Sequence, residues 1–226
     1  SYDHIVSNTA MATVTNTATW TGADSAGGFA VNDTIPYNFE DISGTGTAVP
    51  LGDDEVSLAQ PMGFTFDYFG VNYTDAYISS NGFLTFLPGQ SNGCCSGQAI
   101  PTAGSPDAII AAWWEDLYPP GGGSIQYQTL GVAPNRYFIA QYTNLPHFSS
   151  GNPVTMQVKL FEGTNVIEVH YQDAPSDSGT HSAGVENETG TIGVQYVLQS
   201  TGLVTPLAVQ YTPATAVTAS ASDSAT

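Results

Sequence analysis

The most chemically suggestive run of this sequence places two tryptophans before two carboxylates, Trp113-Trp114-Glu115-Asp116. Glycosidases hold a sugar between two carboxylates, and aromatic rings stack on sugars, so Trp113, Trp114 and Tyr118 are candidate carbohydrate contacts. Neighbouring residues of a strand point to opposite faces, however, so Glu115 and Asp116 cannot form a catalytic pair by themselves. The alternative interpretation puts one indole in the core and the other over a sheet edge, as is common for tryptophan.

A second acidic run, Asp53-Asp54-Glu55, could supply oxygen ligands for Ca²⁺. It matches no EF-hand pattern, and an acidic turn exposed to water is the simpler interpretation. The histidines lie too far apart in the sequence for a local metal-binding motif. They are His4, His147, His170 and His181.

The two cysteines of the chain are adjacent, Cys94-Cys95, so they cannot join distant strands. Three states remain open for them: a vicinal disulfide, two free thiols, or bridges to another chain. An oxidising compartment would favour the vicinal disulfide. Such a bridge would make the loop of residues 88–101 more rigid.

Charge limits the partners that the protein can have. Arg136 and Lys159 are the only basic residues, against 20 acidic ones, which gives a formal net charge of −18. Such a surface repels nucleic acids and anionic membranes, and it attracts divalent cations. The sequence contains no apolar run long enough to span a bilayer. We therefore expect no nucleic-acid partner, no membrane span, and an extracellular or cell-surface location.

Short alternating runs separated by Gly, Pro and Asn predict the elements that position these residues. The central example is residues 64–86, where Asn81-Gly82 between aromatic runs predicts a hairpin turn. Residues 37–42, 48–51 and 55–58 are further short strand candidates. Residues 108–117 are almost continuously apolar, which fits a buried strand or one helical turn. The β-branched residues, the tryptophans and the flanking proline favour the strand.

The most regular alternation lies between residues 154 and 171. Even-numbered apolar residues from Val154 predict a core face, with Gln157 and Lys159 on the opposite face. In the next strand Glu168 and His170 are expected to face water. About a dozen such strands, without an amphipathic helical window, predict an all-β antiparallel sandwich.

The terminal segments are poor in large apolar residues. We assign residues 1–35 to an N-terminal arm, 36–211 to the sandwich, and 212–226 to a Ser/Thr/Ala-rich tail. The Thr-rich alternation of residues 9–20 predicts an edge strand or one shared with a neighbouring chain. The residues predicted to form this assembly strand are Thr13, Val14, Thr15 and Trp20.

Several longer runs carry a family resemblance. They are PMGFTFDYFGVNYTDAYISSNGFLTF, IIAAWWEDLYPPGGGSIQYQ, PNRYFIAQYTNLPHF, VTMQVKLFEGTNVIEVHYQ and SAGVENETGTIGVQY. Over about residues 36–211 the chain resembles bacterial secreted and surface proteins that are similar to the nidogen-like extracellular domain of animal matrix proteins. The resemblance implies a β-rich extracellular module without catalysis, and it carries no agreed ligand-binding residues.

These observations predict a secreted structural or surface-interaction protein that is not an enzyme. We expect it to assemble with copies of itself, as a filament or matrix subunit or in cell adhesion, by adding a terminal strand to a neighbour's sheet edge. A carbohydrate-binding extracellular module is the alternative. A secreted hydrolase comes third, because it would need a cleft with converging carboxylates.

Overall fold

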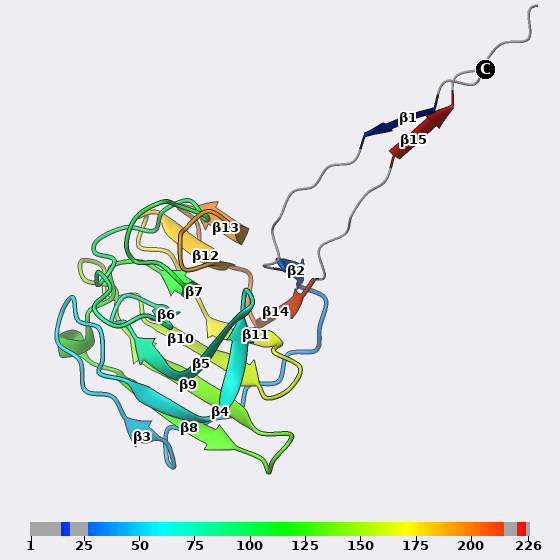
Figure 1. Ribbon diagram of the computed structural model, residues 1–226. Helices are drawn as coiled ribbons and strands as arrows, with labels where there is room; N and C mark the ends of the chain where they lie inside the picture. Colours follow the sequence, from blue (N-terminus) through cyan, green and yellow to red (C-terminus); the bar gives the residue numbers. More distant parts are fainter. Residues whose placement is uncertain (1–14, 19–26, 215–220, 225–226) are drawn as a thin grey trace, which may run out of the picture.

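The computed structural model describes residues 15–18, 27–214 and 221–224 (Figure 1). Within these ranges the regular structure is all β, apart from one 3-10 turn, η1 (Pro119–Gly121). One sheet has seven strands in the order β2 (Phe29–Asn32), β14 (Leu207–Pro213), β11 (Ile167–Asp173), β10 (Val154–Phe161), β9 (Tyr137–Leu145), β8 (Ser124–Leu130) and β3 (Thr47–Ala48). The other has six, in the order β13 (Gly193–Gln199), β12 (His181–Glu186), β7 (Ile109–Trp114), β6 (Phe83–Thr85), β5 (Val71–Ile78) and β4 (Gln60–Tyr68).

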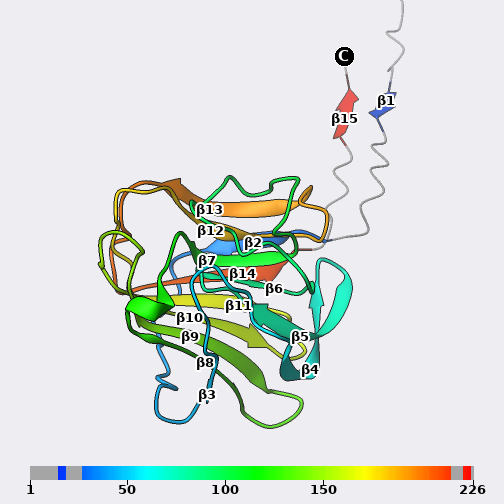
Figure 2. The same ribbon diagram turned by 90° about the vertical axis from the view of Figure 1, so that its left-hand side faces the viewer.

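The two sheets pack face to face (Figure 2), and every pairing of strands in them is antiparallel. The main core lies between them, where Phe66 and Ile78 of one sheet share a cluster with Phe138 and Val158 of the other. Each such side chain contributes about 1.5–3 kcal/mol when it is fully buried. The predicted antiparallel sandwich of about a dozen strands is therefore confirmed.

The predicted Asn81-Gly82 turn joins β5 to β6. Tyr77 lies opposite Thr85 in the ladder, and Ile78 lies opposite Leu84. Gly82 has a φ of +76°, a conformation that glycine adopts without a steric cost. The backbone preferences of Asn81 and Gly82 were thus enough to predict this turn.

Chain segments outside the strands also cover the outer faces of both sheets. A small second core of Phe83, Ile100, Ile109, Ala111 and Trp114 lies on the side of the six-stranded sheet that faces away from the main core. This arrangement leaves all six residues of β7 buried, as the continuous apolar run predicted.

On the seven-stranded sheet the outer face is covered by residues 37–42, which we call the strap. The strap was predicted to be a strand, and that prediction is wrong. Side chains of the sheet hold it instead: Gln141 and Gln157 accept hydrogen bonds from strap N–H groups at 2.9 and 3.0 Å. Lys159 Nζ donates to a strap carbonyl at 2.7 Å, and His170 Nδ1 accepts a strap N–H at 3.2 Å.

The strap corrects a second expectation, that His170 faces water, and it covers Gln157 and Lys159 as well. All three side chains are buried. Their polar atoms replace the ladder hydrogen bonds that the strap backbone would otherwise need. The other two short strand candidates are only partly formed. In residues 48–51, Ala48 alone belongs to a strand, β3. In residues 55–58, Val56 alone forms a bridge, with Ser79.

The sandwich also begins earlier than predicted. β2 lies inside the segment assigned to an N-terminal arm, yet it pairs with β14 as the edge of the seven-stranded sheet. Of the predicted assembly strand, Thr13, Val14 and Trp20 lie outside the described residues. Thr15 begins β1 (Thr15–Ala18), which pairs antiparallel with β15 (Ala221–Ser224) in a sheet of two strands.

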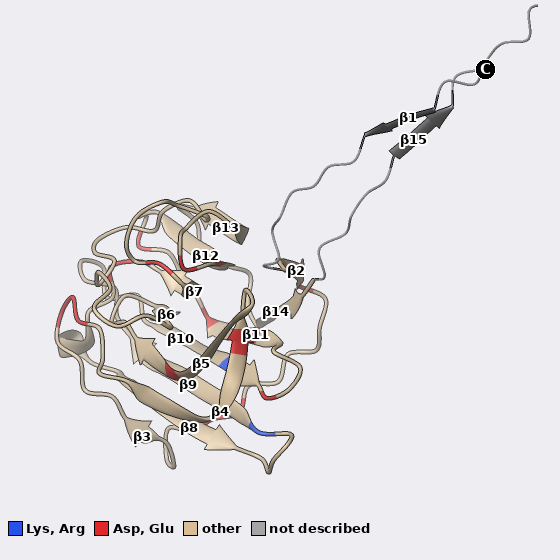
Figure 3. Cartoon of the chain, in the orientation of Figure 1, with Lys and Arg blue, Asp and Glu red and all other residues tan. Residues whose placement is uncertain are grey.

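Figure 3 shows how sparse positive charge is on the fold. Arg136 lies just before β9 and forms an ion pair with Glu162, while Lys159 of β10 is the buried residue beneath the strap. Both cations are thus engaged by the protein itself, and the charge of the protein is overwhelmingly negative. In the described part of the chain no helix has the length and apolar character needed to cross a membrane.

Candidate metal centre

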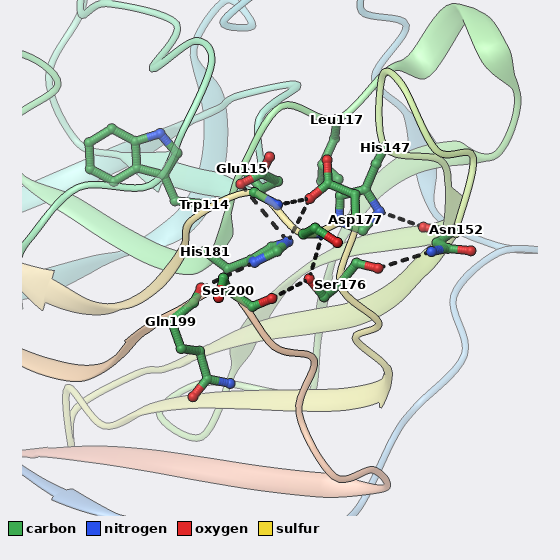
Figure 4. Close-up of polar contacts among 12 residues, drawn as sticks. Trp114, Glu115, Leu117, His147, Asn152, Ser176, Asp177, His181, Gln199 and Ser200 are labelled. Carbon is green, nitrogen blue, oxygen red and sulfur yellow. Dashed lines mark hydrogen bonds and ion pairs between the residues drawn. The ribbon is translucent and has the colours of Figure 1, made fainter.

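Four titratable side chains converge at one end of the sandwich (Figure 4). Glu115 directly follows β7, His147 follows β9, Asp177 lies in the loop between β11 and β12, and His181 is the first residue of β12. We call these four residues the His–carboxylate cluster. Figure 4 shows the Trp114 ring pointing away from it.

Strand register explains why the cluster forms. Ser182 of β12 lies opposite Trp114 of β7 in an antiparallel pair, so the residue before Ser182 lies beside the residue after Trp114. These two residues are His181 and Glu115. A bridge between Leu117 and His147 then brings in the segment that follows β9.

Both histidines have a defined tautomer. His147 Nδ1 lies 2.6 Å from the carbonyl oxygen of Asn152, and His181 Nδ1 lies 3.3 Å from that of Gln199. A carbonyl oxygen can only accept, so each Nδ1 carries the hydrogen. The lone pair of each neutral ring is therefore on Nε2. Trp113 further fixes the His181 ring by stacking on it, with ring centroids 4.6 Å apart.

The atoms that face the centre of the cluster lack partners. Nε2 of His147, Nε2 of His181 and Oε2 of Glu115 are buried and make no hydrogen bond. His181 Nε2 lies 3.4 Å from Oδ1 of Asp177 and 3.9 Å from Oε2 of Glu115. Leaving such atoms unsatisfied costs about 1–3 kcal/mol each.

The electrostatics of the cluster favour uncharged histidines. Burial lowers the pKa of both His147 and His181, so each ring is held in the form that can donate a lone pair. Burial, and then the charge of Asp177, raise the pKa of Glu115 to about 7. For the neighbouring Asp116, burial and then the charges of Asp54 and Asp53 raise the pKa to about 6.

This combination of donors suits a metal ion. The candidate ligand atoms of His147, Asp177 and His181 all lie within 4.8 Å of one another. Two imidazole nitrogens with carboxylate oxygens are ligands that Zn²⁺ and similar ions accept. Metal-binding histidines commonly donate their other N–H to a carbonyl group, as both rings do here.

The acidic run proposed as a Ca²⁺ site is divided by the fold. Asp53 and Glu55 are exposed, and the Glu55 carboxylate accepts the N–H of Gly52 at 2.6 Å. Asp54 is half-buried and lies near Asp116 beside the cysteines. Three adjacent residues therefore do not converge on one point, and Ca²⁺ binding at them stays a prediction.

Cys94 and Cys95 form a vicinal disulfide in the structure. Their loop is held to the six-stranded sheet on both sides. The indole Nε1 of Trp114 donates to the Gly93 carbonyl at 2.7 Å, and the Gly97 N–H donates to the Thr180 carbonyl at 2.7 Å. Because the cysteines are joined, they are not available as thiolate ligands.

The tryptophans predicted as carbohydrate contacts are both completely buried. Trp113 belongs to the main core and Trp114 to the small second core, on opposite faces of β7. A sugar can stack only on an exposed ring, so the prediction is wrong for these two residues. Tyr118 is half-buried and makes an edge contact with Phe148, and its role as a carbohydrate contact stays a prediction.

Sequence reasoning missed the pairing of His147 with His181. Their ring centroids are 5.5 Å apart although the residues are distant in the chain. Both occur where a strand ends or begins, which is the one sequence signal that could have pointed to them. No local spacing rule detects such a pair, since the contact depends on how β9 and β12 are placed.

The fold makes the protein an all-β sandwich of two antiparallel sheets. The chain belongs to the nidogen-related family, described as NIDO related, whose family profile matches residues 29–226. A nidogen-related domain indicates an extracellular setting. No solved structure matches the chain.

Glu186 in β12 provides a test of buried charge away from the His–carboxylate cluster. Its Oε2 accepts the Thr102 N–H at 2.8 Å, while Oε1 is buried without a partner. Burial, assisted by the charge of Asp107 and opposed by that hydrogen bond, raises the pKa from 4.5 to about 7. The folded state therefore holds the proton more tightly than the unfolded chain does.

The sign of the resulting pH dependence follows from this shift. Glu186 imposes no penalty below pH 4.5, and stability falls as the pH rises toward 7. We expect Glu186→Gln to remove this fall. The amount by which the variant exceeds the parent in free energy of unfolding should be about 2–3 kcal/mol larger at pH 8 than at pH 4.5. Urea unfolding of the variant and the parent at pH 4.5 and at pH 8 measures this difference. The exposed Glu188→Gln is the control, and equal pH slopes for the two variants would contradict the prediction.

Proposed function

We propose that the protein is a secreted, non-catalytic structural or surface-interaction module that assembles with copies of itself. Membership of the nidogen-related family supports an extracellular, β-rich module. The burial of Glu115, His147 and His181 supports a structural part for them, because a catalytic group must be able to touch its substrate.

The observation that carries this proposal is the pairing of β1 with β15. It is a ribbon of two strands, four residues each, and its sheet has no third strand among the described residues. An isolated pair of strands is at best marginally stable in water. The ribbon therefore gains most by adding to the sheet edge of another molecule, where further main-chain hydrogen bonds become available.

The edge strand best suited to receive it is β13. Its seven residues include no charged side chain and no proline, the two usual devices that protect an edge. The other edge of the same sheet, β4, contains Pro61 and Asp67. β3, at one edge of the seven-stranded sheet, has two residues only. We propose that β13 of one copy accepts the terminal ribbon of the next.

Proline substitutions in β1 test this assembly. Thr15→Pro with Thr17→Pro removes two main-chain donors from a strand of four residues. We expect the full-length chain to form oligomers or filaments at high concentration and the proline variant to stay monomeric. Light scattering after size-exclusion chromatography, with negative-stain electron microscopy, measures the difference.

The matched control is Thr15→Ser with Thr17→Ser, which keeps the donors and should assemble like the parent. Residues 27–214 contain both large sheets, so the melting temperature of all three proteins should agree within a few degrees. A parent chain that stays monomeric at high concentration, or a proline variant that assembles equally well, would overturn the proposal.

A further inference from the structure

We propose that Glu115, His147, Asp177 and His181 form a binding site for one divalent transition-metal ion of the Zn²⁺ type. A bound ion would link three segments at one end of the sandwich (Figure 4). They are the segment after β7, the segment after β9, and the end of the loop that leads into β12. This inference is independent of how the protein assembles.

The first argument is the convergence of unused donor atoms. Three of the four side chains are at least nine-tenths buried, with exposed fractions of 2% for Glu115, 1% for His147 and 0% for His181. Each has one atom without a partner that faces the cluster: Oε2, Nε2 and Nε2 respectively. An ion among them would give a partner to both histidines beside Asp177, and Glu115, whose Oε2 lies 3.9 Å from His181 Nε2, would complete the set by a small movement.

The second argument is spacing. Ligand atoms about 2.1 Å from a tetrahedral zinc lie roughly 3.4 Å from one another. His181 Nε2 and Asp177 Oδ1 are 3.4 Å apart, and His181 Nε2 and Glu115 Oε2 are 3.9 Å apart. Small side-chain rotations would close the remaining gap, since the ligand atoms of His147, Asp177 and His181 already lie within 4.8 Å of one another.

The third argument is the way the two imidazoles are held. Asn152 and Gln199 each receive an Nδ1–H through a backbone carbonyl, so both Nε2 lone pairs are directed into the cluster. The two ring centroids lie only 5.5 Å apart. Orientation by an outer hydrogen bond is the usual support of a metal-binding histidine.

The donor set decides the class of metal. Ca²⁺ and Mg²⁺ bind through oxygen, so two imidazole ligands disfavour them. Imidazole with carboxylate suits Zn²⁺, and also Co²⁺ and Ni²⁺. Asp177 is the least buried of the four, which gives an ion a route inward. Asp116 lies close enough for its charge to act on Glu115 and to be acted on by Asp177, and it adds negative charge that attracts cations.

The other acidic group does not support a second site. Asp54 and Asp116 lie near Cys94 and Cys95, but both sulfurs are used in the disulfide. Asp54 also already accepts the amide of Asn81 at 2.8 Å. The proposal is therefore confined to the His–carboxylate cluster.

Calorimetry on the full-length chain, stripped with a chelator, tests the proposal directly. Titration with Zn²⁺ should show one tight site per chain, distinct from weak binding by the many surface carboxylates. Saturation should raise the melting temperature by about 5–10 °C. With Co²⁺ as the probe, the visible absorption of a four-coordinate ion should develop with the same stoichiometry.

Substitutions of the proposed ligands test which residues bind the ion. His181→Gln and Asp177→Asn should each weaken Zn²⁺ binding at least about 100-fold and abolish the melting-temperature rise. Asp177 lies in the loop before β12 and is the least buried of the four residues, so its variant stays informative if the His181 variant fails to fold. The control is Asp53→Asn, an exposed acid outside the cluster, which should bind like the parent. Weak binding only, equal binding by Asp177→Asn and the control, or preference for Ca²⁺ would overturn the inference.

Discussion

Gly82→Ala is expected to destabilise the sandwich by about 4 kcal/mol or more, a large share of the roughly 5–15 kcal/mol that stabilises a typical domain. Two effects add at this turn between β5 and β6. Alanine is strained at the φ of +76° that Gly82 adopts. A Cβ there would also lie 2.8 Å from the carbonyl carbon of Trp113 and closer still to its oxygen. That neighbour is backbone of the buried β7, so it cannot move aside.

The close approach at Gly82 has a structural purpose. Its carbonyl oxygen accepts the N–H groups of Ala112 and Trp113 at 3.1 and 3.0 Å. The turn is thus held against β7, and only a residue without a side chain allows this distance. Loss of the turn would release the strand that precedes the His–carboxylate cluster.

Gly89→Ala separates the two effects. Gly89 has a similar φ of +72°, but nothing lies within 4 Å of the position that its Cβ would take. We expect it to cost about 1 kcal/mol, which is the strain alone. Urea unfolding of both variants gives the difference. Equal destabilisation would mean that the approach to Trp113 is not tight in solution.

Trp114→Ala is expected to destabilise the protein by about 3–5 kcal/mol, the usual range for emptying a buried tryptophan site. The ring is completely buried and packs against Phe83 in the small second core, with centroids 5.8 Å apart. Its Nε1 holds the cysteine loop through the Gly93 carbonyl. We therefore also expect faster hydrogen exchange in residues 93–97 at denaturant concentrations where the sheets stay folded.

A pair of phenylalanine variants isolates the hydrogen bond. Trp113 and Trp114 are equally buried, but only Trp114 has a partner for its Nε1, while that of Trp113 has none. Trp114→Phe should therefore cost about 1 kcal/mol more than Trp113→Phe, and it alone should loosen the cysteine loop. Equal costs, with unchanged exchange in the loop, would show that Gly93 does not depend on the indole.

The predictions from sequence that were confirmed concern interactions between near neighbours in the chain. The alternation from Val154 to Leu160 places these residues in the core because side chains of a strand point to opposite faces in turn. Asn81-Gly82 forms its turn because glycine accepts a positive φ. The adjacency of Cys94 and Cys95 leaves no geometry other than a local one for a bond between them.

The predictions that failed depend on what covers a surface. His170 occupies the outward face of its strand, as its position requires, but the strap lies over that face and buries it together with Lys159. Likewise, both faces of β7 are covered, so Trp113 and Trp114 are both internal. Alternation specifies which side a residue points to, and it does not specify whether that side meets water.

The sequence by itself therefore determined the class of fold, the main strands and the central turn, since these rest on periodicity and on local backbone preferences. The family followed from the resemblance of longer runs to known proteins. Tertiary structure alone decided the His–carboxylate cluster. Its members come from the ends of β7, β9 and β12 and the loop before β12, and they meet because Ser182 pairs with Trp114 and His147 bridges to Leu117. Such pairings are contacts between residues far apart in the chain, and their register is set by the packing of the whole core.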